Sequence, residues 1–368
     1  MSFFDEIRTE DYDEWGQIIA AATPEDVQTA LDRPRRTVRD FAALVSPAAV
    51  PFLPRIAGEA ERLTRIRFGQ TVNMYIPLYL SNICSNRCRY CGFAADNHFK
   101  RRILTPAETE EECLAIRKLG YETILVVTGE SGQSGMRYFR EVIPLIKRHA
   151  AYLMMEVQPL DTQDYRELRE MGVDCVCVYQ ETYHEPTYRE NHLGGRKTDM
   201  RYRMETPERL GEAGMDKIGM GILLGLAEFR TDAVMLARHI AYMRRHYWRS
   251  RLSLSFPRLR PAEGGFCPPF PVSERELLQY VCAFRLFDPE LEISISTRES
   301  ASFRDMIVPL VINSISAGSC TQPGGYARPN EEVPQFVIND DRPTEEISAR
   351  LRNAGLDVIW HSSRIGQA

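Results

Sequence analysis

The sequence predicts an α/β fold: a (β/α)8 barrel of the TIM type, with a helical extension before it and a short extension after it. Strand patterns alternate with helix patterns between residues 71 and 320, and eight strand candidates fit into this region. Each of the first seven is followed by a helix pattern, which favours a parallel sheet. Eight such units over about 250 residues match the usual size of a closed barrel.

The expected strands cover residues 73–80, 123–128, 152–157, 174–179, 217–224, 251–256, 291–296 and 314–319. The segments 251–256 and 291–296 alternate apolar side chains with serine or glutamate, which is the period of a strand with two different faces. We expect their apolar faces to contact the helices and their polar faces to line a hydrated interior. An open, doubly wound sheet is the alternative. No G-x-G-x-x-G motif follows any strand, which removes the simplest dinucleotide-binding interpretation.

Start signals mark the helices between these strands. Residues 105–108 and 273–276 are capping boxes, and Pro207 stands at the first position of a short helix that ends by Gly214. Further helices are expected at residues 138–149, 161–172 and 303–311. The apolar face of the helix after the fifth strand consists of Leu236, Ile240, Met243 and Tyr247.

Two extensions flank the predicted barrel. Residues 1–70 are expected to be helical, because Pro24 and Pro47 stand where helices would begin. Residues 321–368 are expected to pack on the barrel, with a turn-rich start and a small helix over residues 343–354.

Composition excludes several classes of protein. The net charge of −5 argues against broad binding of nucleic acid, which requires a basic surface. No run of about 18 apolar residues suggests a membrane span, and the first residues lack the features of a secretory signal. Nine cysteines without a targeting signal fit the reducing cytoplasm.

A C-x3-C-x2-C run, Cys84, Cys88 and Cys91, directly follows the first predicted strand. Three thiolates on one short loop suit a four-iron, four-sulfur (4Fe–4S) cluster, which takes four ligands and would keep one iron open to a group outside the protein. The alternative is a structural zinc site with His98 as the fourth ligand. Zinc modules usually pair two short ligand elements, and this sequence has no second pair of that spacing.

Polar residues follow most of the predicted strands, at the end of a barrel where active sites lie. They include Glu130 after the second strand, Glu156 at the end of the third, Arg298 after the seventh and Ser316 in the eighth. Carboxylates and arginines are rarely buried without a partner. Their convergence on one rim therefore predicts a binding site. Cys175 and Cys177 would both lie on one side of a strand, and we interpret them as small buried side chains.

Several of these motifs resemble one enzyme family, the aromatic amino acid lyase branch of the radical S-adenosylmethionine (SAM) enzymes. The resemblance lies in residues 78–93 with Lys100-Arg101, in 128–130, 155–160, 179–184, 255–261 and 296–300. Residues 321–326 and Asp340-Asp341-Arg342 resemble most specifically the tyrosine lyases of thiamine biosynthesis, which are 2-iminoacetate synthases. The resemblance runs nearly end to end and departs at Cys320, where such lyases often carry lysine.

This resemblance implies an enzyme with a 4Fe–4S cluster and SAM as cofactors. It would take a hydrogen atom from the amino group of L-tyrosine, cleave the Cα–Cβ bond and release 2-iminoacetate and p-cresol. Flavodoxin or ferredoxin would donate electrons, and thiazole synthase is a further candidate partner. A lyase of the tryptophan type remains the alternative. A sister maturase with a second cluster site near its C-terminus does not fit, since one cysteine follows Cys282.

The resemblance also implies roles for individual residues. Arg298 would bind the tyrosine carboxylate with help from Ser316, and Tyr183 and His184 are expected near the phenol. A rim ion pair with Glu299 is the alternative role for Arg298. The cluster ligands would be Cys84, Cys88 and Cys91, and the SAM contacts Phe93, Gly129, Glu130, Glu156 and Arg203.

Overall fold

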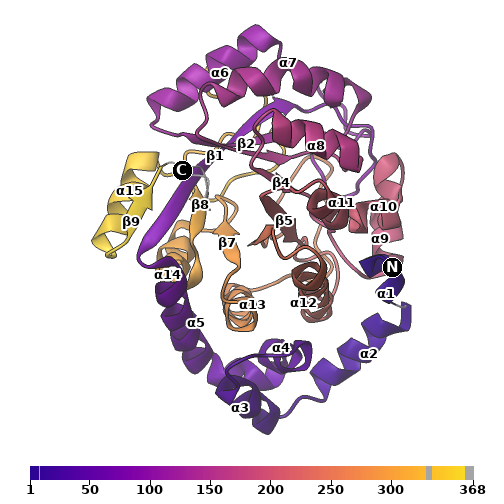
Figure 1. Ribbon diagram of the computed structural model, residues 1–368, viewed down its shortest axis with the longest axis vertical. Helices are drawn as coiled ribbons and strands as arrows, with labels where there is room; N and C mark the ends of the chain where they lie inside the picture. Colours follow the sequence, from indigo (N-terminus) through magenta and orange to yellow (C-terminus); the bar gives the residue numbers. More distant parts are fainter. Residues whose placement is uncertain (8, 329–333, 361–368) are drawn as a thin grey trace.

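The computed structural model describes the whole chain except residues 8, 329–333 and 361–368. Eight parallel strands form a closed barrel, because β1 pairs with β8 on one side and with β2 on the other. Figure 1 looks along this barrel. The predicted (β/α)8 fold is therefore confirmed, and the open sheet is excluded. The strands are β1 (Thr71–Ser81), β2 (Thr123–Thr128), β3 (Tyr152–Glu156), β4 (Cys175–Cys177), β5 (Lys217–Gly221), β6 (Arg251–Ser255), β7 (Glu292–Ile295) and β8 (Ser314–Ser316).

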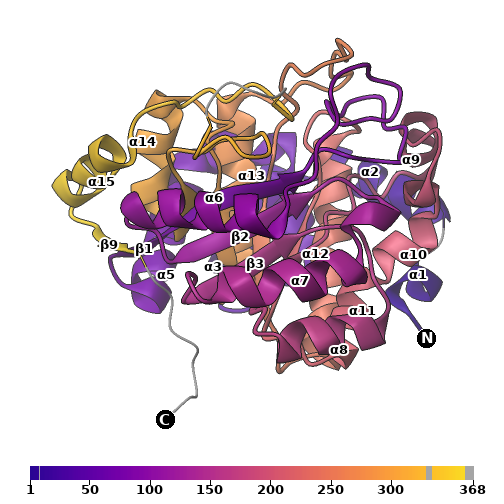
Figure 2. The ribbon, with the colours of Figure 1, turned by 90° about the horizontal axis from the view of Figure 1, so that it is seen from above.

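Helices surround the barrel, and both predicted capping boxes are present at the starts of α6 and α13. The connection from β4 to β5 is longer than expected, since α9 and α10 precede the predicted short helix, α11. Figure 2 shows the loops after the strands rising at one end of the barrel. The helices are α6 (Pro106–Lys118), α7 (Met136–Lys147), α8 (Thr162–Glu170), α9 (Glu185–Asn191), α10 (Met200–Met204), α11 (Thr206–Glu212), α12 (Phe229–His246), α13 (Glu274–Phe287) and α14 (Ala301–Val311).

The N-terminal segment is helical, as predicted, and forms an arc outside α12, α13 and α14 (Figure 1). Its elements are α1 (Phe3–Glu6), α2 (Thr9–Ala20), α3 (Pro24–Asp32), α4 (Val38–Val45), the 3-10 helix η1 (Pro47–Phe52) and α5 (Leu53–Phe68). Phe41 of α4 packs on Phe284 of α13 with ring centroids 4.6 Å apart, which anchors the arc to the barrel. Within the described residues no single helix has the length and apolar character of a membrane span, although α4 and η1–α5 reach it together as a pair bent by 79°.

The C-terminal extension joins the barrel sheet by hydrogen bonds as well as by packing. The predicted small helix is α15 (Thr344–Asn353). It is followed by β9 (Asp357–Ile359), which pairs in parallel with Thr71–Asn73 at the start of β1. This ninth strand is an addition to the closed ring of eight. It uses the first residues of β1, which β2 leaves free because β2 pairs with β1 only from Ile76 onward.

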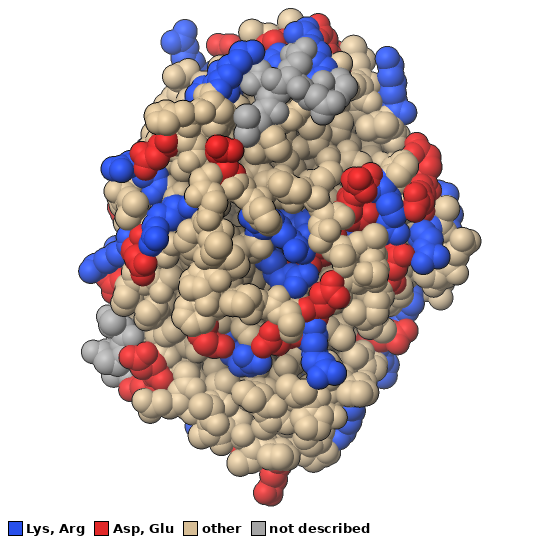
Figure 3. Space-filling model, turned by 180° about the vertical axis from the view of Figure 1, so that it is seen from behind, with Lys and Arg blue, Asp and Glu red and all other residues tan. Residues whose placement is uncertain are grey.

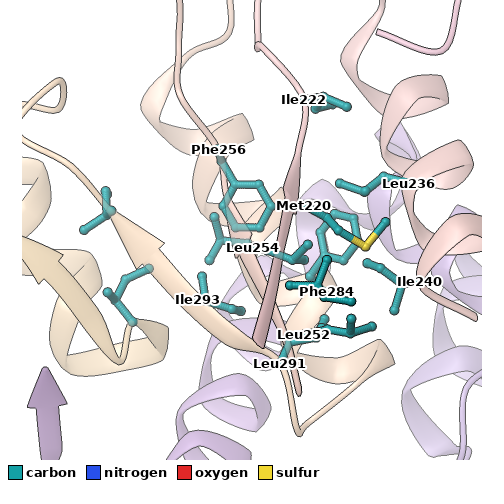
Figure 4. Close-up of a cluster of buried hydrophobic side chains, with 14 of the residues drawn as sticks. Met220, Ile222, Leu236, Ile240, Leu252, Leu254, Phe256, Phe284, Leu291 and Ile293 are labelled. Atoms are coloured by element: carbon teal, nitrogen blue, oxygen red, sulfur yellow. The ribbon is translucent and has the colours of Figure 1, made fainter. Parts of the chain in front are cut away.

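The alternating strands divide the core into an outer apolar layer and a polar interior. Figure 4 shows Leu252 and Leu254 of β6 packed with Met220 of β5 and with side chains from α12 and α13. Four serines of β6, β7 and β8 point the other way and line an internal cavity; they are Ser253, Ser255, Ser294 and Ser314. The expected separation of apolar and polar faces is therefore confirmed. A strand puts successive side chains on opposite faces, so one sequence period produces both layers.

A buried ion pair ties the C-terminal extension to the rim of the barrel. Arg304 of α14 lies 2.5 Å from Asp340, and the two side chains are 2% and 0% exposed. Arg304 also donates to the carbonyl oxygen of Ser316. The pair thus joins α14, β8 and the extension at one point.

We predict that Asp340→Ala lowers the free energy of unfolding by about 3–5 kcal/mol, because it leaves a buried guanidinium without its counter-charge. Urea unfolding followed by circular dichroism measures this change. Glu111→Ala is the matched control, since Glu111 pairs with Arg328 at the surface, where both side chains are about half exposed, and should cost at most about 1 kcal/mol. Equal losses in the two variants would contradict the prediction.

Candidate active site

A cavity of about 190 Å³ opens at the carboxyl ends of the strands. It lies at the end of the barrel that faces away from the viewer in Figure 1, and Figure 3 shows lysine and arginine side chains gathered near the centre of that face. Ten of the twelve residues singled out from the sequence line it: Cys84, Cys88, Cys91, Phe93, Gly129, Glu130, Glu156, Arg203, Arg298 and Ser316. Tyr183 and His184 do not.

The cysteine loop is fixed to the neighbouring strand ends by its backbone. The backbone N–H of Ser85 donates to the carbonyl oxygen of Glu130 over 2.8 Å, and that of Arg87 donates to Gly194 over 3.0 Å. Gly129 is required at the end of β2 because a Cβ atom there would lie 2.4 Å from the carbonyl oxygen of Ile83. The loop and the end of β2 can approach this closely only with glycine.

The three thiols suit an iron–sulfur cluster better than a single zinc ion. Cys84, Cys88 and Cys91 line the same cavity and form no disulfide. Among the described residues, no group of three or more His, Cys, Asp or Glu side chains is arranged to hold one metal ion. His98, the fourth ligand of the zinc alternative, is exposed and lies outside the cavity lining. Burial raises the pKa of all three thiols, Cys88 to about 12, so their thiolates need a bound cationic group.

Two carboxylates and two basic side chains form a network of three ion pairs beside the cysteine loop. Arg203 lies 2.8 Å from Glu130 and 3.3 Å from Glu181, and Lys197 lies 2.6 Å from Glu181. Glu130 also accepts a hydrogen bond from the side-chain amide of Asn86, which stands in the cysteine loop. Burial alone would raise the pKa of Glu181, but Lys197 and Arg203 hold it below its usual value. This side of the cavity is therefore charged but internally balanced.

Glu181 and Lys197 were missed as site residues in the sequence. Glu181 is the only non-glycine residue with a positive φ, 72°, in the described part of the chain. Such a backbone is costly for a residue with a side chain and persists only where the surroundings hold it. Lys197 follows a helix that no sequence signal marked, and neither residue lies at a recognisable spacing from the cysteines. The one available signal was the position of Glu181 just after a strand.

Tyr183 and His184 lie outside the cavity, so the expectation that they stand near a substrate phenol is not met. The hydroxyl of Tyr183 bonds to Nδ1 of His239 on α12 over 2.9 Å. His184 is the N-cap residue of α9, and its ring contacts the hydroxyl of Thr187. The left-handed turn at Glu181 directs the next residues toward the helix layer. Asp232 of α12 fixes them there by accepting bonds from the Thr182 hydroxyl and the Tyr183 backbone N–H.

The opposite wall of the cavity carries Arg298. Its guanidinium carbon lies 3.4 Å from the centre of the Phe336 ring. The alternative role for Arg298, a rim ion pair with Glu299, is wrong: the carboxylate of Glu299 is bound by Arg258 and Arg260. Arg298 consequently faces the cavity without a carboxylate partner among the described residues.

The C-terminal extension closes part of the cavity mouth, which the sequence did not indicate. Thr321, Gln335 and Phe336 belong to the lining. The side-chain oxygen of Gln335 accepts a bond of 2.7 Å from the hydroxyl of Tyr79 in β1. Cys320, the residue at which the chain departs from the family pattern, does not line the cavity. Its sulfur packs close to Gly325 instead.

Comparison with known proteins agrees with this geometry. Residues 78–240 match the radical SAM superfamily, and residues 255–357 match the biotin and thiamin synthesis associated domain. The chain is 49% identical to the 2-iminoacetate synthase of Escherichia coli, over 100% of this chain and 98% of that protein. It is 50% identical to the 2-iminoacetate synthase of Salmonella typhimurium, with 98% and 96% covered.

The chain belongs to the 2-iminoacetate synthase family of radical SAM enzymes. Membership of this superfamily implies SAM and an iron–sulfur cluster as cofactors. Among solved structures, HydG, a maturase of the FeFe hydrogenase, superposes with a TM-score of 0.88 at 28% identity, over 96% of this chain and 79% of that one. The family thus shares the barrel and its N-terminal helices with HydG.

We predict that Gly129→Ala prevents normal assembly of the cysteine loop in this 2-iminoacetate synthase family member. The added methyl group would collide with backbone at Ile83 and separate the loop from β2. Iron and sulfide bound per chain after anaerobic reconstitution should fall several-fold. Gly132→Ala is the control, since a Cβ there meets nothing within 4 Å, and it should bind as much iron as the parent protein. Full iron content in Gly129→Ala would refute this role.

Proposed function

We propose that the protein cleaves the Cα–Cβ bond of L-tyrosine to form 2-iminoacetate and p-cresol, and so supplies the precursor of the thiamine thiazole. The proposal rests on one observation: a single cavity is lined both by three free thiols and by a guanidinium that has no ion-pair partner among the described residues. The thiols suit the cofactor, and the guanidinium suits the carboxylate of an amino acid. The names of the two bacterial relatives support the same reaction.

The wall near the cysteine loop is the proposed cofactor side. Cys84, Cys88 and Cys91 would hold the 4Fe–4S cluster, and Glu130 would accept bonds from the ammonium group of SAM. Phe93, Gly129 and Arg203 line the same region. When bound, the two cofactors supply a radical that removes a hydrogen atom from the substrate.

The wall with Arg298 is the proposed substrate side. A guanidinium presents two parallel N–H donors that match a carboxylate, and Phe336 supports the guanidinium from one face. Ser316 lies in the same lining and could donate a further bond. The aromatic part of tyrosine would enter the lumen among Tyr75 and Tyr179, and the C-terminal extension would exclude water from above.

Partners and location follow from the same proposal. Cleavage of SAM requires a low-potential electron, so we propose flavodoxin or ferredoxin as the donor and thiazole synthase as a protein that receives the product. A cytoplasmic location would suit free thiols and an oxygen-sensitive cluster.

The reaction itself is tested by product analysis under strict exclusion of oxygen. Reconstituted protein with SAM, a strong reductant and L-tyrosine should form p-cresol together with 2-iminoacetate, or with glyoxylate from hydrolysis of the imine. Mass spectrometry identifies both fragments. Cleavage of SAM without any fragment of tyrosine would refute the proposed substrate. An indole-derived product from L-tryptophan would indicate the tryptophan type of lyase instead.

We predict that Cys84→Ala, Cys88→Ala and Cys91→Ala each abolish the cluster. A 4Fe–4S centre held by only two protein thiolates should not persist, so bound iron and sulfide should fall below about a tenth of the parent value. Elemental analysis and the optical spectrum of the reconstituted proteins measure this loss. Cys267→Ala removes an exposed cysteine and should retain the full cluster. One zinc per chain with no sulfide in the parent protein would contradict the assignment.

We predict that Arg298→Met raises the KM for L-tyrosine roughly 10–100-fold, which corresponds to the loss of a charge-assisted hydrogen-bond pair. Arg298→Lys should restore only part of this loss, because an ammonium group cannot form the two-pronged contact. Steady-state kinetics at saturating SAM give the values. The iron content should remain that of the parent protein. An unchanged KM would show that another group binds the carboxylate.

A further inference from the structure

Two opposite charges in the cavity have no hydrogen-bond or ion-pair partner among the described residues. Glu130, Glu181, Lys197 and Arg203 neutralise one another, and Arg260 pairs with Glu299. The carboxylate of Glu156 and the guanidinium of Arg298 also line the cavity. Neither forms a hydrogen bond or ion pair with another described residue through its charged group.

Glu156 stands at the end of β3 and lines the cavity, where a charge is costly because little water surrounds it. Burial raises its pKa to about 7, and among nearby charges Arg298 opposes this most strongly. The other charged groups that act on it are Glu181, Lys197 and Arg203. The titratable groups around it are Tyr75 and Tyr79 of β1, Cys177 of β4 and Tyr179 in the loop after β4. A buried carboxylate without an ion-pair or hydrogen-bond partner is rare in proteins unless a ligand supplies that partner.

We propose that Glu156 and Arg298 together recognise the two charges of a zwitterionic amino acid, and that Glu156 accepts a proton from its α-ammonium group. The inference rests on the proposed function and adds to it the group that prepares the substrate amine. Arg298 binds the α-carboxylate of the amino acid, and Glu156 binds its α-ammonium group. The two side chains line one cavity and do not bond to each other, and we place the substrate between them.

The proton transfer is balanced within the cavity. One N–H bond of the ammonium breaks, its electron pair stays on nitrogen, and an O–H bond forms on Glu156. No electron is gained or lost. Burial favours the neutral forms of both partners, since it raises the pKa of a carboxyl group and lowers that of an ammonium group. The product is a neutral amine, which is the form from which the proposed reaction removes a hydrogen atom.

This role replaces the expectation that Glu156 contacts SAM. Glu130 is tied to the cysteine loop by bonds to Ser85 and Asn86. Glu156 has no bond to any residue of that loop, and the charge that acts on it most strongly is Arg298, on the opposite wall. We therefore assign Glu130, which is bonded to the cysteine loop, to the cofactor and Glu156 to the substrate.

Ligand binding separates this inference from a purely structural role. L-tyrosine and 3-(4-hydroxyphenyl)propanoate, which lacks the amino group, are titrated calorimetrically into anaerobic holoenzyme with SAM and an oxidised cluster, where no turnover occurs. Glu156→Gln should weaken tyrosine binding roughly 10–100-fold and leave the desamino analogue within about twofold of the parent protein. Arg298→Met should weaken both ligands. Glutamine has nearly the same shape, and equal thermal midpoints of parent and variant will establish that it folds.

The pH dependence gives a second readout. Below pH 7 the carboxyl group of free Glu156 is protonated and cannot accept the proton, so kcat/KM for tyrosine should rise as the pH passes through about 7. Glu156→Gln should lower kcat by roughly 10²–10⁴-fold and remove this limb of the profile. Glu156→Asp should restore part of the rate and the limb.

The outcomes distinguish the inference from the proposed function. If the parent protein forms no p-cresol from tyrosine, the proposed function fails. If the parent protein forms p-cresol and Glu156→Gln binds tyrosine equally well with the same pH profile, only the present inference fails. Weaker SAM binding in Glu156→Gln with unchanged tyrosine binding would also overturn the inference. It would show that Glu156 contacts SAM.

Discussion

Closure of the parallel barrel is the constraint on which the site depends. β1 pairs with β8 and with β2, so all eight strands run the same way around a closed ring. Their carboxyl ends must then meet at one rim, however far apart the residues lie in the chain. Cys84 after β1, Glu156 at the end of β3 and Arg298 after β7 come to a common cavity for this reason.

The charges in that cavity fall into a paired group and an unpaired group among the described residues. In a low-dielectric site, an ion without a partner is costly, while a paired ion keeps its geometry. Glu130 and Glu181 are held by Arg203 and Lys197, which gives the proposed cofactor side a fixed arrangement before any ligand binds. On the proposed substrate side, the charged groups of Glu156 and Arg298 form no ion pair with another described residue. In the proposed function the ligand supplies the opposite charges, so binding and selection of a zwitterion would be one event.

The sequence predicted the fold well because the barrel signals are local. Alternating serines and leucines in residues 251–255, capping boxes and strand lengths all reflect interactions between residues a few positions apart. The thiol ligands were equally accessible, since Cys84, Cys88 and Cys91 share one loop. Residues directly after strands, such as Glu130 and Arg298, could be placed at the rim from the topology alone. Tyr183 and His184 followed the same rule and failed, because the left-handed turn at Glu181 rotates them toward α12.

The sequence by itself thus determined the barrel, the cysteine loop and the set of polar residues near its rim, because each depends on short-range periodicity or spacing. Only the tertiary structure decided which charges are paired. Lys197 reaches Glu181, and Gln335 reaches Tyr79 across more than 250 positions of the chain. Whether Glu156 and Arg298 have partners also depends on the three-dimensional arrangement of many side chains. Pairing is a property of distances in space, which no local pattern of residues encodes.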